Sequence, residues 1–380
     1  MMLDTRGTIT DSLPHSTGST VLKTVRTIAA RELPPIVQKI DAEGHYPGEL
    51  LRAFGAAGAY ASHLPENGNA DLVTAIRAMA VAGEYCLSTA FCMWCQDALA
   101  WYVHASDNAA LRERLGPAVA RADMLGGTAL SNPMKSFFGI ESMRLKGRRV
   151  AGGYVVRGVL PFVSNLGDDH AFGAVFEVED EPRRHVMAVV RCAAEGLSLV
   201  GNTRFVALDG TRTFAVQLRD VMVPDDDVLA DPIEEYLRRI RAGFILLQSG
   251  MAFGLVRGCV DLMRQMKGPL GHVNKYLEPQ PEEVAEKLDA LTGWVERLAA
   301  TPFETDPGYW RQVLEARLAA SEAAVAAAHA AMLHCGARGY LSNAPAQRRL
   351  RESYFVAIVT PATKQLKKML AEMSHQVVAA

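Results

Sequence analysis

Two short blocks in the middle of the chain place small hydroxyl residues beside apolar ones, at a spacing that could serve a flat cofactor. The first block is Thr128-Ala-Leu-Ser-Asn-Pro133, and the second is Leu160-Pro-Phe-Val-Ser-Asn165. Both fall between Asp123 and Phe172, a segment rich in glycine and β-formers, so we expect them at strand ends. Strand ends offer backbone N–H groups, hydroxyls and an apolar wall together. A planar ring with polar edges, such as an isoalloxazine, requires that mixture.

Length and charge limit the classes of protein that the chain can be. With 380 residues it is longer than one core usually serves, so two or three domains are expected. The formal net charge of −2 gives no field that would recruit nucleic acid or an acidic membrane. No uninterrupted apolar run approaches the roughly 18–20 residues that cross a bilayer. Residues 1–20 have no basic start followed by an apolar block, so they indicate a loose polar arm rather than a secretory signal.

The cysteines indicate buried, reduced thiols and a cytoplasmic setting. They lie mostly in apolar, helical contexts, which is typical of an intracellular chain of this size. Cys92 and Cys95 have the spacing of a redox or metal pair, but no second pair exists and their neighbours are apolar. We therefore predict no metal site. The six cysteines are Cys86, Cys92, Cys95, Cys192, Cys259 and Cys335.

The periodicity of apolar residues divides the chain into helical, strand-rich and helical parts. Leu72, Ile76, Met79 and Gly83 are spaced for one face of a helix, and helices are expected over about 91–104 and 108–115, with a turn at 63–69. From about 123 to 223 the period becomes two. We therefore predict four regions: an arm at 1–20, an N-terminal α-helical domain at 21–122, a β-domain at 123–228 and a C-terminal four-helix bundle at 229–380.

The expected strands suggest a small antiparallel barrel or sandwich. They are short, are separated by glycine or acidic turns, and have no helices between them. No GxGxxG follows a strand, which argues against a dinucleotide-binding βαβ fold. The four segments are 154–158, 172–178, 185–190 and 213–218.

Four long amphipathic helices are expected in the last part of the chain, and short connections between them favour an antiparallel bundle. They cover about 232–266, 284–298, 307–335 and 344–376. The last is interrupted at Thr360-Pro361, because proline removes an amide donor.

This order of parts, together with the two hydroxyl blocks, resembles the acyl-CoA dehydrogenase superfamily over nearly the whole chain. The first block is similar to the family's A-L-T-E-P segment and the second to its W-I-T/S-N segment. A third stretch, Gly336-Ala-Arg-Gly-Tyr340 followed by Pro345 and Arg348, is similar to the glycine turn after the third bundle helix. The resemblance implies FAD held between the β-domain and the bundle in a homo-oligomer, a tetramer or a dimer.

The resemblance also implies cofactor contacts and an acyl-CoA as the small-molecule substrate. The substrate pocket would be lined by Phe244 and Gln248 on the first bundle helix, where some members carry the catalytic glutamate. The residues expected to contact the flavin are Thr128, Leu130, Ser131, Phe162, Ser164 and Gly336.

The chain departs from the family where the chemistry is done. The usual catalytic glutamate follows the glycine turn, and counting forward places Thr360 at that position. A threonine hydroxyl cannot remove an α-proton near neutral pH, so the catalytic residue is left unassigned. Asn132 replaces the usual glutamate of the first block. The turn whose arginine reaches the FAD pyrophosphate is not visible at 267–274.

The resemblance therefore predicts an FAD-dependent oxidoreductase of the acyl-CoA dehydrogenase type, and two alternatives stay open. An α,β-dehydrogenase of acyl thioesters would need another carboxylate near the flavin, for which Glu84 and Asp97 are weak candidates, and an electron-transfer flavoprotein as its partner. A flavin-dependent monooxygenase would use reduced FAD or FMN from a reductase together with oxygen, and Ser164, Thr360 or His334 beside the ring would suffice. The second alternative is a catalytically degenerate protein that binds an acyl thioester or another protein. The arginines at 238, 239 and 241 could then meet a CoA phosphate, although a solvated face is the commoner role of such a cluster.

Overall fold

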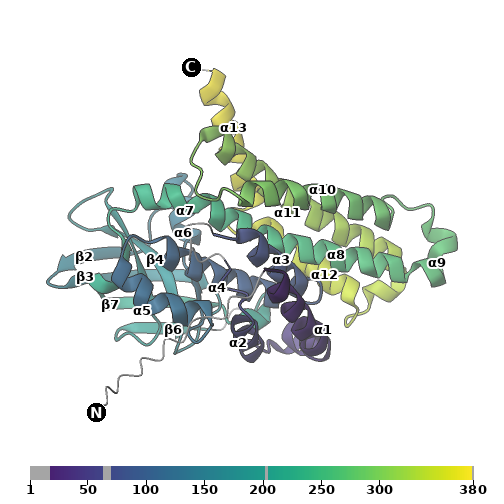
Figure 1. Cartoon of the computed structure of the whole chain (residues 1–380), viewed down its shortest axis with the longest axis horizontal. Coiled ribbons are helices and arrows are strands. Elements are labelled where there is room, and N and C mark those ends of the chain that lie inside the picture. The colour runs from purple at the N-terminus through teal and green to yellow at the C-terminus, as the bar shows by residue number, and fades with distance from the viewer. Residues whose placement is uncertain (1–17, 63–69, 202–203, 379–380) are drawn as a thin grey trace, which may run out of the picture.

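The computed structural model describes residues 18–62, 70–201 and 204–378, which form a helical layer, a β-sheet and a helical bundle (Figure 1). Most of the expected polar arm lies outside the described residues, and so does the expected turn at 63–69. Residues 18–20 already belong to the first helix. The fold class expected from the sequence is confirmed, with differences in the sheet and in the first bundle helix.

The N-terminal part is helical, and one of its helices forms the centre of the molecule. Every residue of α4 from Leu87 to Val103 is buried, because the helix packs against neighbours on all sides, including β1, α7 and α8. The Trp101 indole donates a hydrogen bond to the Ile240 carbonyl at 2.9 Å. The Tyr236 hydroxyl donates one to the Tyr102 carbonyl at 2.6 Å, so both bonds join α4 to α7. The helices are α1 Gly18–Glu43, α2 Gly48–Ala56, α3 Leu72–Gly83, α4 Leu87–Ala105 and α5 Ala109–Ala120.

The central part is a single mixed sheet with the order β6-β7-β3-β2-β4-β5-β8, and β1 pairs with β4. All four expected strands are present. Two pairings, β1 with β4 and β2 with β4, are parallel rather than antiparallel, because helical or long connections separate these strands along the chain. The strands are β1 Gly126–Thr128, β2 Lys146–Val150, β3 Gly153–Val163, β4 Ala171–Val178, β5 His185–Arg191, β6 Leu197–Val200, β7 Phe214–Pro224 and β8 Val228–Ala230, and the short helix α6 Ser131–Phe137 follows β1.

Alternation along β4 divides the core in two. Phe172 and Phe176 belong to an apolar cluster formed by the β-domain itself, whereas Ala171 and Val175 belong to the larger cluster of the helices. Both faces of β4 are therefore buried, which explains why this segment is apolar almost throughout.

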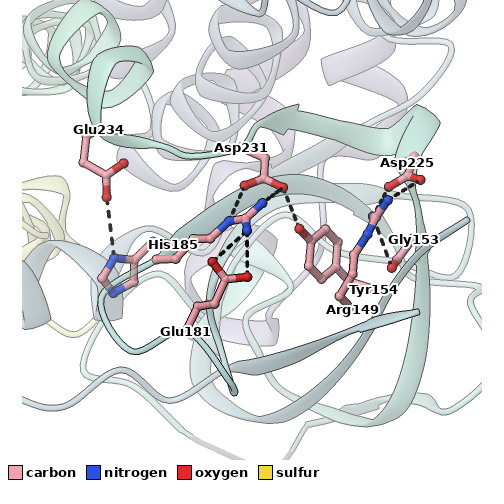
Figure 2. Close-up of polar contacts among 9 residues, drawn as sticks. Arg149, Gly153, Tyr154, Glu181, His185, Asp225, Asp231 and Glu234 are labelled. Atoms are coloured by element: carbon pink, nitrogen blue, oxygen red, sulfur yellow. Dashed lines mark hydrogen bonds and ion pairs between the residues drawn. The ribbon is translucent and has the colours of Figure 1, made fainter. Parts of the chain in front are cut away.

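A polar network fastens the sheet to the segment that leads into the bundle (Figure 2). The Tyr154 hydroxyl of β3 donates to Asp231 at 2.5 Å. Arg184 pairs with Asp231 at 3.0 Å and with Glu181 at 2.7 Å. Arg149 of β2 pairs in bidentate fashion with Asp225, which follows β7. These contacts hold Asp225 and Asp231 beside β2 and β3, and β8, which lies between these two residues in sequence, joins the sheet by pairing with β5.

The C-terminal part is the expected bundle, with a break in its first long helix. The single helix expected at 232–266 is divided at Gln248, where Ser249 and Gly250 follow and the Gln248 side chain bonds to other elements. The break expected at Thr360-Pro361 is confirmed. The helices are α7 Glu234–Leu247, α8 Ser249–Gln265, α9 Lys267–Asn274, α10 Pro281–Ala299, α11 Pro307–Cys335, α12 Pro345–Ile358 and α13 Thr363–Val378.

Two stretches are long and apolar enough to cross a bilayer by length and composition, Glu234–Gln265 and Pro307–Tyr340. Charged and polar residues interrupt both stretches, so this finding does not contradict the expectation that no uninterrupted apolar run is long enough. In the most apolar window of the first stretch, 94% of the residues are buried inside the protein, as in the core helix of a bundle.

Candidate functional site

A cavity of about 1310 Å³ lies between the sheet and the bundle, where the strand ends meet α4, α7, α11 and α12. Its inner wall is apolar and buried, and includes Phe91, Trp94 and Phe244. Its mouth is formed by exposed side chains of α11 and α12 and by charged residues of α6 and α13. A large pocket with apolar walls and a few convergent polar groups is what a planar aromatic cofactor and an organic substrate need.

A row of hydroxyl groups forms the sheet side of the cavity. Ser164 Oγ lies 2.6 Å from Thr213 Oγ1, which lies 2.8 Å from Thr211 Oγ1. Thr211 donates to the Leu208 carbonyl at 2.7 Å, which fixes the end of the row. Because β3 pairs with β7, residues far apart in sequence stand side by side here.

The end of β1 is held rigidly beside this row. Thr128 Oγ1 lies 2.8 Å from the Tyr102 hydroxyl and accepts the Leu130 N–H at 3.2 Å. The amide of Asn165 donates to the Gly126 carbonyl at 2.7 Å, and this joins the ends of β1 and β3. The two sequence blocks therefore meet at one wall, as their positions at strand ends predict.

The position expected for the catalytic base carries no carboxylate. Thr360 lines the cavity, and its Oγ1 lies 2.9 Å from Ser131 Oγ, so a pair of hydroxyls occupies the place. The Thr360 carbonyl accepts a hydrogen bond from the Gln248 side chain at 2.9 Å. Arg317 Nε donates to the same glutamine at 2.6 Å, which places a buried guanidinium behind the cavity wall.

Two of the residues that line the cavity in the described chain are acidic, and both are paired near the mouth. Glu141 accepts from Asn132 at 2.9 Å and lies 3.8 Å from the Lys135 ammonium. Glu322 is paired with Lys367 at 2.9 Å. Both carboxylates are therefore held in ion pairs with lysines at the mouth.

The carboxylates considered as substitutes lie elsewhere. Neither Glu84 nor Asp97 is among the residues that line the cavity. Glu84 pairs with Arg26 and Arg257, at 3.4 and 3.6 Å, and burial raises its pKa. Asp97 is fully buried on α4, and desolvation raises its pKa well above the ordinary value.

The structure brings most of the predicted cofactor contacts to one wall. Thr128, Ser131, Phe162 and Ser164 line the cavity, as does Phe244 on the bundle side. Three predicted residues are not among the lining residues. Leu130 is buried in the helical core, Gln248 lies behind Thr360, and Gly336 ends α11 with φ +56°.

Several lining residues were not singled out from the sequence. Thr211 and Thr213 could have been noticed as hydroxyls at the start of an expected strand. Nothing local in the sequence marks Phe91, Trp94 or Phe355, since apolar residues at helical spacing usually indicate core. Cys95 also lines the cavity, and burial raises the pKa of its thiol well above the ordinary value.

The basic cluster on α7 lines a second, smaller cavity. Arg238 and Arg241 border a space of about 350 Å³ beside α6, where Arg241 lies 4.2 Å from the centre of the Trp310 ring. Arg239 points elsewhere and pairs with Asp107 at 3.0 Å. His334, also considered from the sequence, lies 3.1 Å from the Pro279 carbonyl and is not a lining residue of the large cavity.

Comparison with known proteins agrees with this arrangement. Residues 17–123 match the family model for the acyl-CoA dehydrogenase N-terminal domain. The human mitochondrial short-chain specific acyl-CoA dehydrogenase is 26% identical over 358 residues, covering 89% of this chain and 85% of that protein. A complex of glutaryl-coenzyme A dehydrogenase with glutaryl-CoA superposes with a TM-score of 0.82 at 18% identity, covering 95% of each chain. A dibenzothiophene monooxygenase from a Paenibacillus species superposes with a TM-score of 0.77 at 15% identity, covering 92% of this chain and 96% of that one.

The helical layer, sheet and bundle of this chain superpose on solved acyl-CoA dehydrogenases. The curated relatives in sequence are also named as acyl-CoA dehydrogenases. Its N-terminal region carries the acyl-CoA dehydrogenase N-terminal domain, and over nearly its whole length the chain is similar to proteins of the acyl-CoA dehydrogenase superfamily. It is an acyl-CoA dehydrogenase-like oxidoreductase.

Proposed function

We propose that the protein is an FAD-dependent oxidoreductase that holds its flavin ring in the large cavity. The observation that carries this proposal is the wall formed by Thr128, Ser164 and Thr213, which faces the aromatic side chains of α4 and α7. Hydroxyls and backbone N–H groups at the strand ends would bind the polar edge of the ring, and Phe162 and Trp94 would cover apolar surface. FMN would fit the same wall, since the ring is shared. When bound, the flavin supplies the two-electron chemistry.

The reaction best supported by the geometry is oxygen-dependent oxidation of an organic substrate without an α-proton base. Thr360 and Ser131 supply hydroxyls at the position where the resemblance implies a carboxylate, and such groups donate and accept hydrogen bonds but do not abstract an α-proton. With a flavin and a substrate bound, the apolar residues that line the cavity would exclude water from the reacting atoms. One of the fold neighbours is named as a monooxygenase. A flavin reductase is the partner that this reaction would require.

The second candidate is α,β-dehydrogenation of an acyl thioester, with an electron-transfer flavoprotein as acceptor. The sequence relatives favour it, since they are named as acyl-CoA dehydrogenases. The small cavity with Arg238 and Arg241 is a second supporting feature, because two guanidiniums beside an indole would suit a CoA phosphate and adenine. The reaction would need Glu141 or Glu322 to leave its ion pair, and removing a general base typically costs about 10²–10⁴-fold in rate.

We also propose a homo-oligomer in a cytoplasmic setting. Apolar side chains beside the cavity mouth are unusually exposed, including Phe162 at 57% and Ile358 at 66%, and a second copy would cover them. Tyr340 is 83% exposed next to Gly336, so a contact of Gly336 with FAD would involve a part of the cofactor outside this cavity. All six cysteines are buried and free, as is typical of a reducing compartment. Light scattering coupled to gel filtration gives the number of copies.

The decisive experiment separates the two reactions and tests the flavin itself. Purified protein should bind FAD with a near-visible absorbance band. Oxygen consumption that depends on a flavin reductase and reduced flavin would support the monooxygenase. Anaerobic bleaching of the band by butyryl-CoA would support the dehydrogenase and refute the first candidate. A protein that binds neither FAD nor FMN would refute both and leave the degenerate binding protein.

A further inference from the structure

A buried guanidinium without an acidic partner lies directly behind the inner wall of the large cavity. Arg317, on α11, is 1% exposed. Its guanidinium donates to the Gln248 side chain at 2.6 Å, to the Val356 carbonyl at 2.8 Å and to Ser321 Oγ. All three acceptors are neutral. Among the described residues, no carboxylate forms an ion pair with it, unlike Arg348, which pairs with Glu352 at 3.2 Å.

Arg317 stays positively charged at neutral pH, and the negative end of the α12 helix dipole neutralises only part of this charge. Burial lowers the pKa of the guanidinium to about 10, so the group stays protonated. The Val356 carbonyl lies in the last turn of α12, where the helix dipole contributes roughly half a negative charge at most. A buried charge normally has an ion partner, because desolvation is costly without one.

Arg317 is linked by hydrogen bonds to two residues that line the cavity, to one directly and to the other through Gln248. Ser321 lines it and receives the guanidinium hydrogen bond directly. Thr360 lines it and is held through Gln248. The positive charge therefore acts on the inner end of the cavity, close to the hydroxyl pair of Thr360 and Ser131.

The other charges around the cavity lie at its mouth and do not neutralise this field. Glu322 is paired with Lys367, and Glu141 with Lys135. Those side chains are partly or fully exposed, so salt screens them, whereas a buried charge in an apolar wall is screened much less.

We propose that the inner end of the cavity binds the carboxylate of an anionic substrate, and that Arg317 is the residue that selects for the negative charge. Ser321 Oγ donates to the Arg317 carbonyl at 3.1 Å, and it would turn this proton toward the carboxylate. The Thr360–Ser131 pair, which keeps one hydroxyl proton free, would supply a second hydrogen bond, and the aromatic wall would hold an apolar body. Arg317 acts through Ser321 and is a positioning residue rather than a catalytic one. The inference deepens the proposed function by giving the charge of the substrate, but it needs no bound flavin.

The test compares benzoate with benzamide, which share shape and apolar surface but differ in charge. Their affinities for the protein as isolated are measured by calorimetry and by quenching of tryptophan fluorescence, since Trp94 lines the cavity. We expect benzoate to bind more tightly by about tenfold or more, because a unit charge acts across a low-dielectric wall. The preference should persist in high salt.

Substitutions locate the charge. R317M should abolish the preference for benzoate, whereas R317K, which keeps a cation, should restore most of it. K367M removes an exposed cation at the mouth and should leave the preference unchanged. Far-UV circular dichroism checks that each variant is folded, and the salt dependence in the wild-type protein gives the same answer without a variant. Equal affinity for benzoate and benzamide, a preference lost in high salt, or a preference lost in K367M but kept in R317M would each overturn the proposal. A protein that prefers benzoate but binds no flavin would refute the proposed function and leave this inference standing.

Discussion

Replacing Gly127 by alanine should damage the sheet wall of the cavity in a measurable way. Gly127 lies in β1, and a Cβ at this position would stand 2.3 Å from the Ser164 carbonyl oxygen, a backbone atom at the end of β3. Ordinary contacts begin near 3.4 Å, so the two strand ends must separate by about 1 Å. Overpacking of this kind typically costs about 1–3 kcal/mol of the free energy of unfolding.

The same shift should weaken flavin binding. Thr128 and Ser164 lie on the two strand ends that must separate, so one or two cofactor hydrogen bonds would be lost, at about 1 kcal/mol each. We therefore expect the dissociation constant for FAD to rise roughly 5–30-fold. The assays are urea denaturation followed by circular dichroism, and FAD titration followed by fluorescence quenching.

Gly268 provides a matched control. It lies in α9, and a Cβ there would meet nothing within 4 Å. G268A should leave FAD binding unchanged and should be neutral or stabilising by up to about 1 kcal/mol, since alanine restricts the unfolded chain. If G127A loses stability but binds FAD as the wild-type protein does, the strand ends are not the flavin wall. If G127A loses neither stability nor FAD affinity, the close approach of Gly127 to the Ser164 carbonyl oxygen is not a rigid feature of the fold.

Three further predictions address the base position, the polar network and pH. If the cavity admits an acyl thioester, T360E should raise the rate of butyryl-CoA dehydrogenation by about 10²-fold or more, because it supplies a general base. T360Q has the same shape without the base and should give no gain. An unchanged rate in T360E would count against the acyl thioester as substrate. Y154F removes the 2.5 Å hydrogen bond to Asp231 and should lower the free energy of unfolding by about 1–2 kcal/mol, as measured by urea denaturation. Y354F, on the exposed face of α12, should lower it by less. Equal losses in the two variants would contradict the role given to the polar network. Burial lowers the pKa of His170 despite the nearby Asp169. The contribution of His170 to stability is therefore fully present above the ordinary pKa near 6.5, and it is lost as pH falls through the lower pKa of the folded state. H170Q should flatten the acid limb of a plot of unfolding free energy against pH, and an unchanged slope would refute this assignment.

The sequence was sufficient for the features that depend on local pattern. The two hydroxyl blocks are flanked by β-formers and turns, so their positions at strand ends could be predicted, and the structure places Thr128 and Ser164 at one wall. The break at Pro361 followed from the loss of an amide donor. Counting from the glycine motif predicts Thr360 at the base position, and the structure places this residue among those that line the cavity.

Other features depend on pairing between distant segments and left no local signal. Thr213 joins Ser164 only because β3 pairs with β7. Arg317 lies in an alanine-rich helix, where an arginine usually indicates a solvated face, and its burial results from the packing of α8, α11 and α12. Gln248, where α7 ends and α8 begins, bonds through its side chain to Thr360 and Arg317, and neither partner could be predicted from the local helical pattern.

The order in which the cavity walls occur along the chain has a consequence for biosynthesis. The lining residues run from Phe91 to Lys367, and the hydroxyl pair joins Ser131 to Thr360, 229 positions later. Since chains are made from the N-terminus, the sheet wall emerges from the ribosome long before the helices that close the cavity. Its apolar face therefore stays exposed until those helices have been synthesised. A nascent polypeptide arrested before Pro361 should therefore expose this face to chaperones, and ligand should rescue only chains released after α13 has emerged.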